Sequence, residues 1–161
     1  MYSMDKLFLT TLKDVYFAER QLLKALPKMA RAAQSETLKQ AFTDHREETQ
    51  EQVARLTRVF EIIGKRAQGQ TCQAMLGLIE EAEELMEEAT EPSQVRDAGL
   101  IACGQAVEHY EMARYGTLAA WAAMMGHEEA AQLLRQTLEE ERKADTLLNR
   151  IATREVNKAA A

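Results

Sequence analysis

The sequence predicts an all-α protein: a bundle of four long helices, with an additional short helix in the connection between the second and the third. Residue types that favour helix dominate the chain, whereas only seven glycines and two prolines occur in 161 residues. Apolar residues recur with a helical period along most of the sequence. No segment shows the alternation that is typical of a half-buried strand. Together these observations indicate helices packed on helices.

Charge and cysteine content exclude several classes of function. The formal net charge of −6 argues against nucleic acid as a partner. No apolar run approaches the roughly 20 residues that span a bilayer, so we expect no membrane association. The N-terminal stretch lacks the basic head and apolar run of a signal peptide. Cys72 and Cys103 are too few and too far apart for a disulfide framework or a zinc cluster. We therefore expect a cytoplasmic protein with two reduced, structural thiols.

The first two long helices are expected over residues 4–33 and 36–63. Pro27 lies within the apolar stripe of the first helix, which predicts a kink or a local break there. Ser35 is a good N-cap for the second helix, because its hydroxyl can accept a hydrogen bond from a free backbone N–H. Gly64 is expected to end that helix, since glycine readily adopts the left-handed conformation that follows a helix.

Three further helices follow. A short amphipathic helix is expected over residues 72–89, with most of its acidic residues facing solvent. The stretch "EPSQ" at 91–94 then breaks and recaps the chain. Long helices are expected over 93–125 and 128–155. No low-complexity linker divides the sequence, so residues 1–161 are expected to form a single helical domain.

The connections indicate two helical hairpins. Short turns near residue 34 and near Gly126 make each pair of long helices antiparallel. Each long helix measures roughly 45 Å at about 1.5 Å per residue. The connection over residues 65–92 can cover that distance, so its length fits both a long crossover and simple up-and-down wiring.

Each long helix carries polar residues near its centre, on the stripe that otherwise faces the core. Helical spacing puts Glu108 and Glu111 in line with Tyr115 and Leu118, for example. Counted from the two hairpin turns, the polar positions of all four helices agree in height within about a turn. We therefore expect one polar layer inside the bundle, formed by these candidate metal ligands: Glu19, His45, Glu48, Glu108, Glu111, Glu141 and Asp145.

Carboxylates that face a bundle core need a partner. Burying an unpaired ion is very costly in free energy, and the inward stripes offer no lysine or arginine at this level. The groups can take up protons, form carboxylic acid pairs or bind a cation. Oxygen-rich sites with an imidazole suit iron or manganese, and two close divalent ions would offset the accumulated negative charge. Zinc usually prefers fewer ligands in tetrahedral geometry.

Four stretches of the chain are distinctive: "DVYFAERQLLKALPKMARAA", "FTDHREETQEQVARL", "VRDAGLIACGQAVEHYEMARYGTLA" and "EAAQLLRQTLEEERKAD". Together they resemble the YciF-type bacterial stress-response proteins, a ferritin-like family of undefined biochemical role, over nearly the whole chain. The resemblance implies a ferritin-like four-helix bundle with a crossover helix, a homodimer and a di-iron-type site. Taken with the donor chemistry, this makes iron the first choice for the two divalent ions and manganese the second. It implies no established substrate.

The ferritin-like ligand pattern takes one Glu from each of two helices and Glu-x-x-His from each of the other two. Glu19 matches the single Glu of the first helix. On the second helix the order is reversed, because His45 precedes Glu48 in "HREE".

The third and fourth helices depart further from this pattern. Glu108 and Glu111 provide one carboxylate more than it requires. Ala144 stands three residues after Glu141, where a histidine is expected, and Asp145 follows it. One histidine is thus missing, which bears on the identity of the metal and on any oxygen-activating chemistry.

Simpler structural roles exist for several of these residues. Glu19 could be exposed and pair with Arg20 or Lys13. Asp145 could accept a hydrogen bond from His45 instead of binding metal. His109 lies off the stripe and is expected at a helix contact or a dimer surface.

Two classes of function follow from the sequence. In the first, two cations bound in the polar layer reduce peroxide or dioxygen by changing oxidation state. In the second, the chain is a non-enzymatic structural or interaction protein of the stress response, whose polar core is metal-free or binds a structural metal. The missing histidine of the fourth helix weighs against strong ferroxidase activity.

Overall fold

The computed structural model describes all residues 1–161, and it confirms an all-α fold with no strand. The long helices are α1 (Met4–Ala32), α2 (Glu36–Ile62), α4 (Gln94–Met124) and α5 (Glu128–Ile151), and the short α3 spans Gln73–Glu88. A π-helical turn (Ala152–Val156) and a last short helix, α6 (Asn157–Ala160), follow α5.

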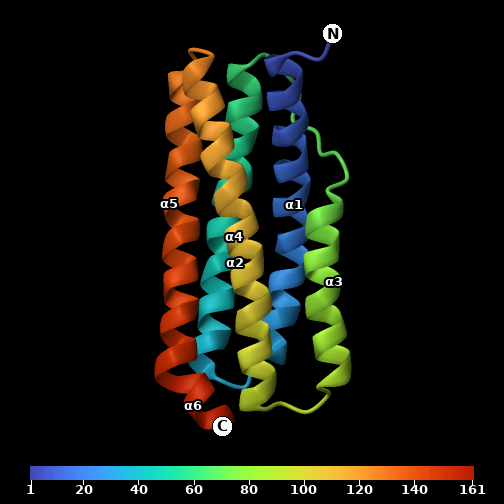
Figure 1. Cartoon of the computed structure of the whole chain (residues 1–161), viewed down its shortest axis with the longest axis vertical. Helices are drawn as coiled ribbons and strands as arrows, with labels where there is room; N and C mark the ends of the chain where they lie inside the picture. The colour runs from blue at the N-terminus through green and yellow to red at the C-terminus, as the bar shows by residue number, and fades with distance from the viewer.

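The four long helices form a bundle in which every neighbouring pair is antiparallel (Figure 1). α1 packs against α2 and α4, and α5 packs against the same two helices from the opposite side. Since α2 and α4 run in the same direction, the chain must return along the bundle between them. It does so through a loop and α3, which packs on the outside of α1 and α4. Of the two wirings that the sequence allowed, the structure therefore has the long crossover.

The helix ends follow from local sequence. Ser3, Ser35 and Ser93 each cap a long helix by accepting a hydrogen bond from the backbone N–H three residues on, as expected for Ser35. Gly64 and Gly126, with φ of 66° and 81°, end α2 and α4. α1 continues through Pro27 without a break.

The C-terminal end differs from the prediction of an α-helix to residue 155. The α-helix ends at Ile151 and the π-turn begins there. In this turn Glu155 accepts a 2.7 Å hydrogen bond from the Ser35 hydroxyl, and Val156 is fully buried. Tertiary contacts at this end of the bundle thus select the wider turn over regular α-helix.

A polar clamp, formed by Arg96 and Asp97, ties the same end of the bundle together. The buried Asp97 carboxylate accepts hydrogen bonds from the backbone N–H groups of Gln34 and Ser35, at 2.8 and 2.7 Å. The Arg96 guanidinium donates to backbone carbonyls at the ends of α1 and α3. One turn of α4 therefore fixes the α1–α2 connection and the end of α3.

The hydrophobic core consists of two separate clusters, which we call the lower and the upper core. The lower core contains Leu22, Phe42 and Leu148 and includes the contacts with α3. The upper core contains Phe60 and Leu118, among others. Between them lies a layer of buried polar residues: Glu19, His45, Thr49, Gln52, Glu108, Glu111, Thr137 and Glu141. The structure thus confirms a polar layer at the centre of the long helices.

Two further expectations concern the cysteines and the membrane. Cys72 and Cys103 are both free, and the Cys72 sulfur lies 3.0 Å from the Tyr110 hydroxyl. None of the helices combines the length and the apolar character that a bilayer span requires.

Candidate metal centre

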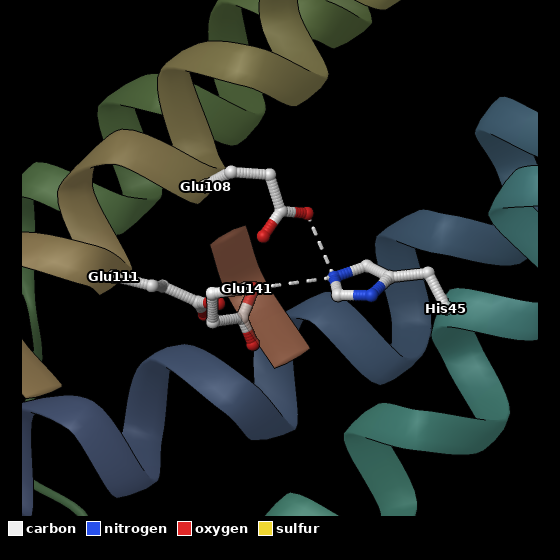
Figure 2. A group of neighbouring side chains, drawn as sticks. All are labelled: His45, Glu108, Glu111 and Glu141. Atoms are coloured by element: carbon white, nitrogen blue, oxygen red, sulfur yellow. Dashed lines mark ion pairs between the residues drawn. The ribbon is translucent and has the colours of Figure 1, made fainter. Parts of the chain in front are cut away.

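Four side chains from three helices meet in the polar layer (Figure 2). His45 comes from α2, Glu108 and Glu111 come from α4, and Glu141 comes from α5. Each offers one ligand atom, and these atoms all lie within 4.8 Å of one another. Glu108 and Glu111 reach the same point because residues three apart share a helix face. We call these four residues the centre.

The two nitrogens of His45 face different surroundings. Nε2 points into the centre, 2.8 Å from Glu108 Oε1 and 3.7 Å from Glu141 Oε2. Although the first contact is short, it is not aligned as a hydrogen bond. On the other side of the ring, Nδ1 lies 3.4 Å from the carboxylate of Glu48, whose side chain is 48% exposed. A hydrogen on Nδ1 directed at Glu48 leaves the Nε2 lone pair for the centre, an arrangement common among metal-binding histidines.

Glu19 brings α1 to the edge of the centre. Its side chain is fully buried, and Oε1 accepts a 2.5 Å hydrogen bond from the hydroxyl of Tyr115. Burial raises the pKa of Glu19 to about 7, although the Tyr115 hydrogen bond acts against this rise. Glu111 and Glu108 are near enough to influence that pKa as well.

The centre has the electrostatics of a crowded acidic site. Burial raises the pKa values of Glu111 and Glu141 well above normal, and neighbouring carboxylates raise them further. Burial alone would lower the pKa of His45, but the carboxylates of Glu108, Glu48 and Glu141 together outweigh burial and raise it well above normal. Burial acts to raise the pKa of Glu108, but His45, Glu141 and His109 together outweigh burial and lower it. The centre therefore holds protons unless a cation takes their place.

Most carboxylate oxygens of this region have no hydrogen-bond partner although they are buried. These atoms are Glu19 Oε2, Glu108 Oε2, and both oxygens of Glu111 and of Glu141. The ion pairs that reach Glu108 and Glu141 come from His45 alone, with no lysine or arginine. Buried polar atoms are normally paired, so this group of orphaned oxygens indicates a missing partner. Several carboxylates with one imidazole form the donor set that suits iron or manganese.

The remaining two predicted ligands lie elsewhere. Glu48 is half exposed and contacts the outer nitrogen of His45, as described above. Asp145 lies outside the centre, where its carboxylate is 3.2 Å from His109 Nε2 and 3.3 Å from Gln105 Nε2. The alternative hydrogen bond from His45 to Asp145 is also not formed, because Glu48 takes that position.

Sequence reasoning missed a second polar link beside the centre. Arg55 on α2 makes a two-pronged ion pair with Glu140 on α5, with both N···O distances at 2.6 Å. Arg55 also donates to Thr137, and Gln52 donates to Glu140. The partners are on separate helices, so local spacing carries no signal for this pair. The inward positions of Thr49 and Gln52, in contrast, follow from the helical stripe of α2.

Comparison with known families gives one match over almost the whole chain. The family model for DUF892, a domain of unknown function, matches residues 3–161. Protein YciF of Escherichia coli (strain K12) is 48% identical over 161 residues, which cover 99% of this chain and 96% of YciF. The similarity therefore extends across every helix of the bundle.

Solved structures give the same result. The crystal structure of the E. coli stress protein YciF matches with a TM-score of 0.92, at 48% identity, over 98% of this chain and 99% of that chain. YcfI, a proposed structural protein from Rhodopseudomonas palustris, matches with a TM-score of 0.88 at 48% identity, over 91% and 93% of the two chains. A protein from Xanthomonas campestris matches with a TM-score of 0.71 at 25% identity, over 92% and 91%.

Proposed function

The chain belongs to the DUF892 family, and from this and its similarity to YciF we propose that it is a stress-response protein whose buried centre binds two divalent metal ions. Iron is the first choice of metal and manganese the second. The observation that carries the proposal is the group of buried carboxylate oxygens without partners. A cation offsets their charge and pairs their lone pairs at the same time.

Five buried residues would hold the two ions. His45, Glu108, Glu111 and Glu141 offer ligand atoms that lie within 4.8 Å of one another, and Glu19 adds its carboxylate from α1 beside them. Iron held here would supply electrons to peroxide or dioxygen. The protein's own groups prepare the site: Glu48 orients the imidazole, the Tyr115 hydroxyl holds Glu19, and the two apolar cores exclude water.

A non-enzymatic structural role in the stress response is the second candidate. It is favoured by Ala144, which stands where a ferritin-like site has its second histidine and contributes no ligand atom. The relative YcfI is likewise described as a proposed structural protein. In this case the polar layer holds protons or a structural metal.

Metal analysis tests whether the centre binds the two ions. Protein purified from cells supplied with iron or manganese is expected to contain about two ions per chain, measured by elemental analysis. Replacing Glu111→Ala and Glu141→Ala together removes most orphaned oxygens and should abolish metal content, while circular dichroism shows nearly unchanged helicity. The matched control is Glu84→Ala with Glu87→Ala, which removes two exposed carboxylates from α3. A double variant that keeps its metal would mean that the assigned ligands are wrong. A metal-free wild-type protein would favour the structural role.

The proposal also places the protein in the cytoplasm as a homodimer, in keeping with the family resemblance. Sedimentation equilibrium of the purified chain is expected to give twice the monomer mass of 18.2 kDa. A concentration-independent monomer would contradict this part of the proposal without affecting the metal centre.

A further inference from the structure

A cavity of about 160 Å³ lies beside the centre, between α2 and α5. Its inner end is formed by His45 and Glu108, two residues of the centre. Both are buried, and His45 Nε2 and Glu108 Oε2 have no hydrogen-bond partner. The cavity thus borders two residues of the centre from the side.

The walls of the cavity are apolar and fixed. Phe42 and Leu148 line it and are buried in the lower core. Gly104 packs directly against both: a β-carbon there would lie 3.1 Å from a Leu148 methyl and 3.4 Å from the Phe42 ring. Such close packing holds these two side chains in place.

The small side chain of Ala144 leaves room in this space. It lines the cavity from α5, one turn after Glu141, at the position where the ferritin-like pattern has a histidine. A methyl group stands where an imidazole would otherwise extend towards the centre. The space beside this methyl group therefore lies next to His45 and Glu108.

The outer end of the cavity has charges of both signs. Asp44, Glu48 and Lys143 line it, and all three are exposed. This mouth has no excess of positive charge with which to attract an anion. At the inner end, two bound divalent ions would carry four positive charges, which the carboxylates of Glu19, Glu108, Glu111 and Glu141 balance, so no excess is left there either. An uncharged ligand needs no such excess.

The size of the cavity limits the ligand further. An engineered apolar cavity of about 150 Å³ in another protein binds benzene, a molecule of about six non-hydrogen atoms. Here one end of a cavity of similar volume is polar. A compact ligand with an apolar body and one nitrogen or oxygen donor atom matches both the volume and the lining.

We propose that this cavity binds a compact, uncharged ligand of about five or six non-hydrogen atoms, whose donor atom takes the place of the side chain missing at Ala144. The inference rests on the proposed metal-binding function and adds to it the class of molecule that the centre accepts from solvent. The apolar body of the ligand lies against Phe42 and Leu148, with its donor atom towards His45 and Glu108.

Imidazole is the probe that tests this inference, since it has the size and donor atom of the missing side chain. Cobalt(II) is loaded into the purified wild-type chain, metal content is measured, and imidazole is titrated while the visible absorption of cobalt is recorded. We expect a saturable spectral change. Acetate is also compact but anionic, and it is expected to give no comparable change at the same concentrations.

The variant Ala144→Leu fills the cavity without removing a donor atom. It is expected to weaken imidazole binding by at least about tenfold while cobalt content and helicity stay at wild-type values. The matched control, Ala113→Leu, adds the same side chain at an exposed position of α4 and should leave imidazole binding unchanged.

The outcomes separate the two proposals. A wild-type chain that binds no cobalt, iron or manganese overturns the metal-binding function and this inference with it. A chain that holds cobalt but does not respond to imidazole overturns the inference alone, and so does equal imidazole binding by Ala144→Leu. Acetate binding as tight as that of imidazole would refute the restriction to uncharged ligands.

Discussion

Raising the pH from about 5 to about 8 is expected to lower the free energy of unfolding of the metal-free protein by several kcal/mol. The reason is that burial raises the pKa values of Glu19, Glu111 and Glu141 above that of a carboxyl in the unfolded chain. A group whose pKa is raised by folding stabilises the folded state fully below the unfolded pKa, and this stability is lost as pH rises through the folded pKa. For Glu19 alone, a rise from 4.5 to about 7 corresponds to roughly 3 kcal/mol.

His45 and Glu108 change the pH dependence of the free energy of unfolding in opposite directions. The raised pKa of His45 gives stability that is present below pH 6.5 and is lost at higher pH, like that of the three carboxyl groups. The lowered pKa of Glu108 gives stability that is present above pH 4.5 and is lost as pH falls. Four of these groups thus make the folded state more stable at low pH, and one makes it more stable at high pH. The free energy of unfolding of the metal-free protein is therefore expected to fall as pH rises.

Bound metal should reverse this pH dependence, so that the metal-loaded protein becomes more stable as pH rises. Ligands must lose their protons to bind a cation, so metal affinity, and with it the gain in melting temperature, grows as pH rises. Urea unfolding at three pH values, with a chelator or with excess manganese(II), measures both slopes. Glu111→Gln removes one titrating group at similar size and should flatten the metal-free slope. A metal-free protein that is as stable at pH 8 as at pH 5 would contradict the buried protonated state.

The substitution Asp97→Ala should destabilise the protein by about 3 kcal/mol and lower its melting temperature by about 10 °C. Asp97 is completely buried, and it accepts hydrogen bonds from two backbone N–H groups in the α1–α2 turn. Alanine leaves both donors without a partner and no longer fixes the turn to α4. Thermal unfolding followed by circular dichroism measures the effect.

Asp5→Ala is the matched control for this effect. Asp5 also lies in the first turn of a long helix, but it is exposed. Losing its interaction with the helix dipole should cost no more than about 1 kcal/mol. Similar losses in the two variants would show that Asp97 acts only through the helix dipole and not through the clamp.

Much of the fold could be predicted because each long helix has an apolar stripe of helical period, and because serine caps and glycine stops mark many of the helix ends. The choice between crossover and up-and-down wiring could not, since the length of residues 65–92 allows both. The π-turn after Ile151 was also beyond prediction. It depends on the hydrogen bond between Ser35 and Glu155, two residues far apart in the sequence.

The candidate centre could be predicted in outline because the same interruption of the apolar stripe recurs in all four helices. Helical spacing alone does not separate a residue that points into the layer from one at its border. Asp145 shows this, since it shares the stripe with Glu141 yet contacts His109. Asp97 gave no distinctive signal, because an acid in the first turn of a helix is common for electrostatic reasons.

The division of the apolar interior into a lower and an upper core has a consequence for how the molecule can change. Each half of the bundle has its own close-packed apolar interior, and a thin polar layer separates the two. Substitutions in that layer can alter its charge or its chemistry while both apolar cores keep their packing. The residues that stabilise the bundle are thus different from those that determine its chemistry. The chemistry of the polar layer can therefore diverge while the fold stays the same.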